Sequence, residues 1–159
     1  MSKMKRFLLL SIILLLFASC SKGKETDTPG SIEYKLNGTQ FSFSKCSIRK
    51  IPGSPGITPT KYLIKGSTGN NSLEMFIPTY SDTLKEQSYT LDSGALPIFV
   101  AGNITYSFMD EPFNFITISV TSYKKGHVSG TFNGEVTNLS GPVDATITDG
   151  KLNDVPVSY

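Results

Sequence analysis

The sequence predicts an all-β domain, a single antiparallel β-sandwich of about eight or nine strands. Three observations indicate this class: short runs alternate apolar and polar residues, turn residues recur roughly every ten positions, and no stretch after residue 20 keeps a helical period over about ten residues. A closed, lipocalin-like β-barrel is the alternative, because barrel strands carry the same alternation.

The first twenty residues predict an export signal. Lys3, Lys5 and Arg6 give a positive start, and residues 7–18 form an apolar run. Signal-peptide apolar regions span roughly 7–15 residues, whereas a membrane-spanning helix needs roughly 20. A polar, turn-rich tether follows, without apolar period. The expected organisation is a signal peptide, a flexible tether and one β domain, at residues 1–19, 20–31 and 32–159.

Residues Phe17–Cys20 resemble the lipobox of bacterial lipoproteins, in which small residues precede a cysteine. Phe17 stands where Leu is more usual. The resemblance implies that the chain is cut before Cys20 and that Cys20 carries a diacylglyceryl group and further acylation. Two or three acyl chains anchor a protein effectively permanently, at about 0.8 kcal/mol per buried methylene. The other interpretation is an ordinary cleavable signal with an incidental cysteine.

Removal of the signal changes the charge balance. The full chain has 15 Lys and Arg residues and 13 Asp and Glu residues, and three of the basic residues lie in the signal, so 12 remain against 13. A chain this close to neutral gives no argument for a nucleic-acid partner. The expected partners are the membrane, through the lipid on Cys20, and an envelope protein.

The first half of the domain is expected to begin with a hairpin. Residues 32–36 and 39–43 alternate around Asn37-Gly38, the strongest short-range hairpin signal. Three prolines and two glycines within residues 51–59 predict a long loop. Further strands are expected at 62–65 and 73–77, joined by a polar turn at 66–71 and closed by Pro78, and at 88–91 and 97–106, the last broken near Gly102-Asn103. Residues 81–87 are the one weak helical candidate.

The clearest sheet signal comes late in the chain. Residues 116–121 alternate, a polar turn follows at 124–126, and the run 127–136 places Val128, Gly130, Phe132, Gly134 and Val136 on one face. Small residues alternating with large ones suit close contact with an aromatic neighbour or a second sheet. Residues 143–147 alternate again before Asp149-Gly150, an expected tight turn, and residues 152–157 form the last expected strand.

That late region also resembles a family. Residues 128–132 (VSGTF) and 145–155 (ATITDGKLNDV) are similar to the C-terminal signature of small uncharacterised lipoproteins from Bacteroidetes, with Leu152 where an aromatic is more usual. The resemblance implies an envelope lipoprotein with no assigned activity. Residues 24–27 loosely resemble a surface-export signal of such lipoproteins, with a plain soluble linker as the other interpretation. Asp82-Thr83-Leu84 resembles their short O-glycan sites.

Few residues are candidates for chemistry. Cys46 is expected to be an inert thiol on the face opposite Phe41 and Phe43, because an acylated Cys20 cannot pair with it. His127, the single histidine, is expected to be a solvated turn residue. The acidic residues at 110, 111, 144, 149 and 154 are expected to be ordinary surface residues of turns and not a catalytic or metal-binding group. The only site residue predicted is therefore the lipidated Cys20; no catalytic, metal-binding or cofactor-binding residue is expected.

The expected function is a non-enzymatic binding or interaction module anchored at the outer membrane. A lipocalin-like carrier of an apolar ligand is the alternative, and an unrecognised hydrolase ranks below it. The aromatic residues separate the first two, because they either fill a core or line a cavity of roughly 300 Å³ or more. Core filling is favoured for the candidates Phe99, Tyr106, Phe108, Phe113, Phe115 and Phe132.

Overall fold

The protein is all-β, as the alternating runs predict. The structure, a computed structural model of the 159-residue chain, describes residues 30–54, 56–81, 83–91, 97–108, 115–140 and 144–159. Within these residues there is no helix and there are eleven strands, against the eight or nine expected. The strands are β1 (Ser31–Leu36), β2 (Thr39–Phe43), β3 (Lys45–Ile51), β4 (Thr60–Thr68), β5 (Asn71–Thr79), β6 (Ser88–Leu91), β7 (Ile98–Ala101), β8 (Ile104–Ser107), β9 (Ile116–Lys124), β10 (His127–Asn138) and β11 (Asp144–Ser158).

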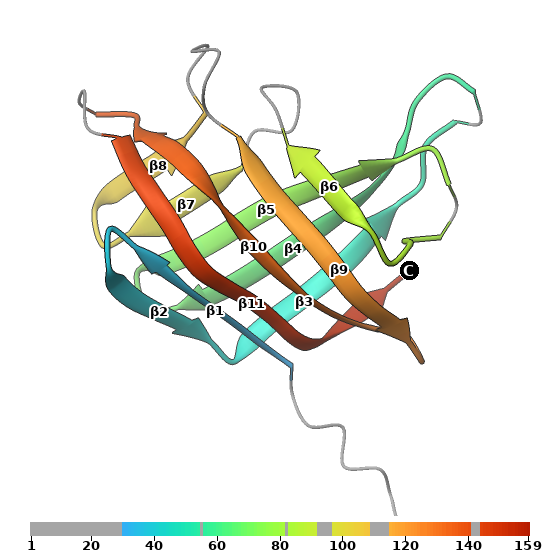
Figure 1. Ribbon diagram of the computed structural model, residues 1–159, viewed down its shortest axis with the longest axis horizontal. Coiled ribbons are helices and arrows are strands. Elements are labelled where there is room, and N and C mark those ends of the chain that lie inside the picture. Colours follow the sequence, from blue (N-terminus) through green and yellow to red (C-terminus); the bar gives the residue numbers. More distant parts are fainter. Residues whose placement is uncertain (1–29, 55, 82, 92–96, 109–114, 141–143) are drawn as a thin grey trace, which may run out of the picture.

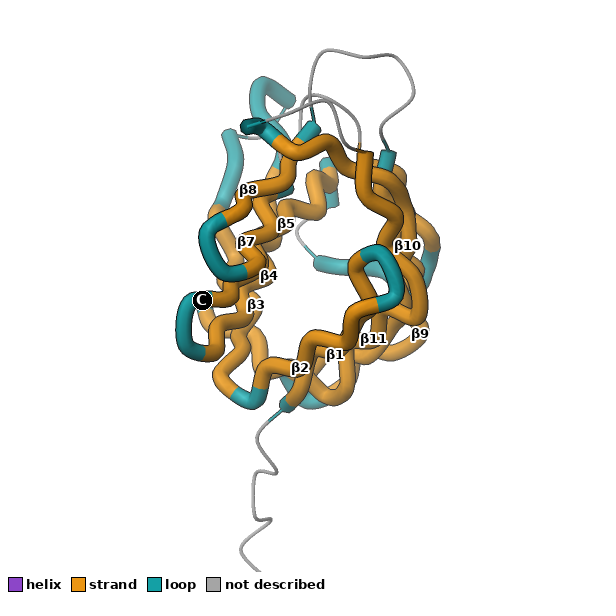
Figure 2. Tube along the Cα trace, turned by 90° about the vertical axis from the view of Figure 1, so that its left-hand side faces the viewer, coloured by secondary structure: helices purple, strands orange, loops and turns teal. Residues whose placement is uncertain are grey.

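The strands form two layers (Figure 1, Figure 2). Strands β2, β1, β11, β10, β9 and β6 pair in that order, and we call them the front sheet; β3, β4, β5, β7 and β8 pair in that order as the back sheet. Two short pairings join the layers, β11 with β3 at Val157–Ile48 and β10 with β8 at Thr137–Ser107. These pairings join the eleven described strands into one sheet that closes on itself, so the front and back sheets are the two sides of a sandwich with barrel-like closure.

One strand pair departs from the expected antiparallel pattern. The end of β11 runs parallel to β3, whereas the other described pairs are antiparallel. Strand β11 pairs with β1 as far as Asn153 and with β3 from Val157 onward. Asp154 lies between these two stretches with a positive φ of 50°. That left-handed residue redirects the strand from the front sheet to the back sheet.

The first predicted hairpin is confirmed. Asn37 and Gly38 have φ values of 49° and 80°, as the two central positions of a type I′ turn require. The Asn37 side chain accepts a hydrogen bond from the Thr146 N–H at 2.9 Å, and the Asn37 N–H donates to the Thr146 carbonyl at 2.9 Å. The turn is therefore fixed to β11 as well as to its own two strands.

The expected tight turn at Asp149-Gly150 is wrong. Both residues lie inside β11, which continues from Asp144 to Ser158. Asp149 has a positive φ of 54°, and the β11 register shifts near this point against both neighbouring strands, so the pair forms a bulge. Gly150 faces Phe132 of β10, and a Cβ on Gly150 would lie 2.6 Å from the Phe132 ring. This glycine is needed because the Phe132 carbonyl oxygen and ring both come too close for a side chain, which the sequence did not predict for this position.

Three further boundaries differ from the expected ones. The turn between β4 and β5 is two residues, Gly69 and Asn70, because both strands extend beyond the predicted runs. Pro78 lies within β5, opposite Lys61, and does not close it. The described residues of 81–87 form no helix. Leu84 is buried at 3% exposure, and the Tyr89 hydroxyl accepts from the Lys85 N–H at 2.9 Å and donates to the Lys85 carbonyl at 3.1 Å. By contrast, the break at residues 102–103 is confirmed as the β7–β8 turn.

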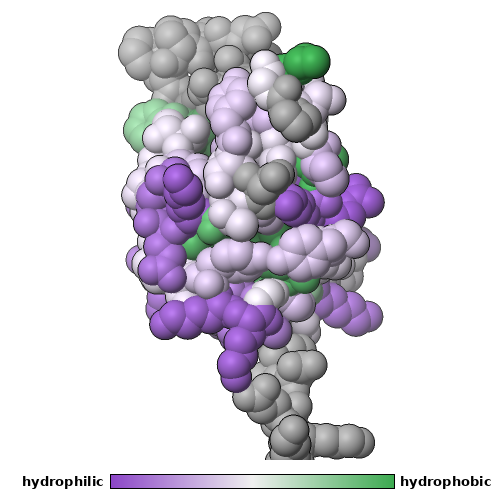
Figure 3. Space-filling view, turned by 90° about the vertical axis from the view of Figure 1, so that its right-hand side faces the viewer, coloured by the Kyte–Doolittle hydropathy of each residue, from purple (hydrophilic) through white to green (hydrophobic). Residues whose placement is uncertain are grey.

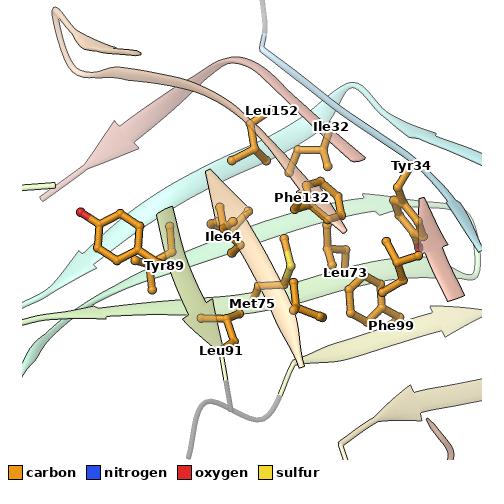
Figure 4. Packing of buried hydrophobic residues seen from close by; sticks show 14 of the residues in the cluster. Ile32, Tyr34, Ile64, Leu73, Met75, Tyr89, Leu91, Phe99, Phe132 and Leu152 are labelled. Carbon is orange, nitrogen blue, oxygen red and sulfur yellow. The ribbon is translucent and has the colours of Figure 1, made fainter. Parts of the chain in front are cut away.

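The core lies between the two sheets. Tyr34 of β1 is at its centre, with its ring centre 5.2 Å from that of Phe41, 5.9 Å from those of Phe43 and Phe132, and 5.5 Å from that of Phe99. Figure 4 shows side chains from both sheets pointing toward one another in this space. Of the aromatic residues expected in the core, Phe99, Tyr106, Phe108 and Phe132 are buried, Phe115 is 49% exposed, and Phe113 lies outside the described residues.

Candidate binding groove on the outer face of β3, β4 and β5

The described residues form a hollow of about 500 Å³, and it lies on the surface and not between the sheets. Three neighbouring strands of the back sheet line it, and their side chains are mostly short or charged. The lining residues are Lys45, Cys46, Ser47, Lys65, Gly66, Ser67, Ser72, Leu73 and Glu74. We call this hollow the groove.

Strand alternation explains why polar side chains gather in the groove. In the register of the sheet, Ser47 is opposite Lys65 and Lys65 is opposite Glu74, so the three side chains share the outer face. The residues between them face the core, where Ile48 and Leu73 are buried. The groove is thus the polar side of the same strands whose apolar side builds the core.

An ion pair crosses the groove. The Lys65 ammonium lies 2.6 Å from a Glu74 carboxylate oxygen, and both side chains are more than a third exposed. Exposed pairs of this kind contribute about 0–1 kcal/mol to stability, so the pair fixes side-chain positions more than it stabilises the fold. Lys45, on the rim, makes no ion pair with a described residue.

Cys46 also borders the groove, but its thiol faces the other way. The chain breaks at Ser44 between β2 and β3, so the expected single run over residues 41–46 is two strands. Cys46 therefore packs against the same core as Phe43, and the expectation of opposite faces is wrong. The thiol donates to the Gly30 carbonyl at 3.0 Å. Burial raises the pKa of the Cys46 thiol, which disfavours the nucleophilic thiolate.

The other residues singled out in the sequence lie away from the groove. His127 begins β10 after the Lys125-Gly126 turn, and its Nδ1 lies 3.2 Å from the Lys125 carbonyl oxygen. Asp144, Asp149 and Asp154 are exposed along β11 in the front sheet. Among the described residues, no three His, Cys, Asp or Glu side chains are grouped to hold a metal ion. Cys20, residues 24–27, Asp82, Asp110 and Glu111 lie outside the described residues.

Asp149 is held by a lysine from the neighbouring strand. The Lys35 ammonium of β1 donates to a carboxylate oxygen of Asp149 at 2.8 Å. This hydrogen bond, followed by the charge of Lys35 itself, lowers the pKa of the Asp149 carboxyl from its usual range. The pair therefore ties the bulge of β11 to β1 on the outer surface of the front sheet.

The core contains one polar atom without a partner. Tyr34 is fully buried, and its hydroxyl oxygen makes no hydrogen bond with a described residue. Burial raises the pKa of Tyr34 well above its usual range. The alternating pattern of β1 predicts that Tyr34 faces inward. It does not predict that the hydroxyl lacks a partner, because this depends on residues from three other strands.

Seven large apolar side chains are exposed on the described surface. Ile57, Tyr80, Ile98, Ile104, Phe115, Leu139 and Tyr159 are each at least 40% exposed. On the face that Figure 3 shows, hydrophilic side chains surround small hydrophobic areas. Within the described ranges, no helical segment has the length and apolar character that crossing a bilayer requires.

Comparison with known proteins gives no relative: no family model, no curated protein and no solved structure matches the chain.

Proposed function

We propose that the chain is a lipoprotein of the bacterial cell envelope and acts there as a non-enzymatic binding or interaction module. The lipid is attached at Cys20, residues 1–19 are removed as a signal peptide, and a short tether carries the β domain at the outer membrane. Support for the anchor comes from the charged start, the short apolar run and the small residues before Cys20. The VSGTF and ITDG segments support kinship with the uncharacterised Bacteroidetes lipoproteins.

The observation that supports binding is the location of the groove. The interior is occupied by side chains from both sheets, with Tyr34, Phe99 and Phe132 each at most 1% exposed. The hollow of about 500 Å³ lies on the outer face of the back sheet. A filled sandwich with a shaped outer face suits recognition at the surface. A carrier would hold its ligand inside, so this geometry favours the binding module over the lipocalin-like alternative.

Metabolic labelling with an alkyne fatty acid tests the anchor. Wild-type protein takes up the label, and the variant Cys20→Ala does not. Cys46→Ala is the matched control, because it removes the chain's other cysteine and keeps the label. An unlabelled wild type, or a labelled Cys20→Ala variant, contradicts the proposal. Mass spectrometry of the mature N-terminus gives the same answer independently.

A further inference from the structure

Charge is divided unevenly between the two sheets. The strands of the back sheet carry five basic residues and one acidic residue, whereas those of the front sheet carry three basic and five acidic residues. Because the chain after residue 19 has nearly equal numbers of both, the difference comes from placement and not from composition. An excess of one sign on one face attracts ligands of the other sign.

Four of the five cations in the back sheet point away from the core. Lys45 and Arg49 of β3, and Lys61 and Lys65 of β4, are exposed, and we call these four residues the basic face. Glu74 is the one carboxylate on the described strands of this sheet, and it pairs with Lys65. The basic face therefore keeps an excess of positive charge, and two of its members line the groove.

Hydroxyl groups lie between these charges. Ser47, Ser67 and Ser72 line the groove, and none of their side chains hydrogen-bonds to another described residue. Each hydroxyl offers one donor and two acceptor lone pairs. The groove thus combines the Lys45 ammonium, which can pair with an anion, the Lys65–Glu74 ion pair, and free hydroxyls, which can pair with the alcohols of a ligand.

Other anionic occupants fit less well. A peptide that adds to a sheet needs an unpaired strand edge, but β4 pairs with β3 on one side and with β5 on the other. An anionic bilayer is flat, so it would contact the basic face and leave the hollow of about 500 Å³ unfilled. A ligand that bears carboxylates and many hydroxyls, and that is slender enough to enter the hollow, matches both features.

We propose that the groove binds an acidic polysaccharide, with Lys45, whose charge no described carboxylate compensates, facing a ligand carboxylate and the three serines facing its hydroxyls. This inference rests on the proposed function as a binding module and names the ligand class of that module. Because exposed charge pairs are screened, binding weakens as salt rises.

The test uses the chain from residue 21 onward, which keeps every described strand and every residue of the core. A hexamer of galacturonic acid is the probe, and maltohexaose is the neutral control of equal length. Binding is followed by amide chemical shifts and by titration calorimetry at low and high salt. The expected shifts cluster in residues 45–47, 65–67 and 72–74, with the galacturonate hexamer binding and maltohexaose not.

Two charge reversals supply the matched comparison. Lys45→Glu on the groove rim is expected to weaken binding by about ten-fold or more at low salt. Lys151→Glu makes the same change on β11 in the front sheet, and less than about a two-fold effect is expected there. Both lysines are exposed, so both variants should keep the wild-type thermal midpoint.

Several results would overturn the inference: equal binding of the neutral hexamer, equal loss in both variants, shifts outside the groove, or no binding of the acidic hexamer. Binding to vesicles of phosphatidylcholine and phosphatidylglycerol through the basic face, without hexamer binding, would assign the charge to a membrane and also overturn it. The anchor is judged separately by fatty-acid labelling. If Cys20 is labelled but the hexamer does not bind, only the ligand class proposed here is contradicted. If the hexamer binds but Cys20 carries no lipid, only the proposed anchor is contradicted.

Discussion

The unpartnered hydroxyl of Tyr34 gives a prediction whose sign is unusual for a core substitution. Tyr34→Phe removes one oxygen that is fully buried and makes no hydrogen bond with a described residue, and it keeps the ring contacts with Phe41 and Phe99. A buried polar group left without a partner costs about 1–3 kcal/mol. The variant should therefore be more stable than wild type by about 1 kcal/mol or more, which raises the thermal midpoint by about 3–5 °C for a domain of this size.

Tyr89→Phe is the matched control, because it makes the same chemical change at a hydroxyl that has partners. The Tyr89 hydroxyl contacts the Lys85 backbone N–H and carbonyl at 2.9 and 3.1 Å. Its removal should cost about 1–2 kcal/mol and lower the midpoint. Differential scanning calorimetry and guanidinium unfolding measure both variants. A destabilised Tyr34→Phe would mean that the hydroxyl is hydrogen-bonded in solution, and the reasoning about the core would be wrong.

The pH dependence gives a second readout of the same group. Burial raises the pKa of Tyr34 in the folded state, while the unfolded chain ionises near the ordinary pKa of about 10. Ionisation of Tyr34 therefore does not change the free energy of unfolding below about pH 10. As the pH rises from there toward the folded pKa, the free energy of unfolding falls by up to about 1.4 kcal/mol per pH unit. Tyr34→Phe should flatten the alkaline limb of the stability curve relative to wild type.

Three other predictions concern single contacts. Gly150→Ala should destabilise the domain by about 3 kcal/mol, because its Cβ would lie 2.6 Å from a buried ring. Gly38→Ala should cost about 1–2 kcal/mol, because Gly38 has a φ of 80° but no atom within 4 Å of the added Cβ. Equilibrium unfolding measures both variants, and equal losses would refute the packing argument. The Cys46 thiol should react with an aromatic disulfide reagent far more slowly in the native protein than in guanidinium, because burial raises its pKa; equal rates would show an exposed thiol. Carboxyl NMR titration should place the Asp149 pKa below the ordinary value of about 3.9, and Lys35→Gln should raise it; an unchanged value would mean that the ion pair is absent in solution.

The sequence predicts the fold well where the signals are local. Alternation and Asn37-Gly38 predict the first hairpin correctly, and the β7–β8 turn is predicted at residues 102–103. The same kind of signal fails at Asp149-Gly150, because a turn and a bulge both need a left-handed residue followed by a small one. The position of Phe132, in another strand, decides between them.

The groove could not be predicted because its lining is not local. Lys45, Lys65 and Glu74 lie in three strands, and they share a face only through the registers of two pairings. Alternation within each strand predicts that these residues face outward. It does not show which strands are neighbours, so the excess of basic residues in one sheet becomes visible only once the strand order is known.

The position of β11 has a consequence for when the domain can fold. This fifteen-residue strand, the last of those described, pairs with β1, β3 and β10, so the first described strand has its long neighbour only when residues 144–158 are present. Ladders between distant segments form slowly, since their loop-closure entropy comes before any contact is gained. The ladder between β1 and β11, at opposite ends of the described domain, should therefore form after the local β3–β4 and β4–β5 hairpins, so the front sheet should close later than the back sheet.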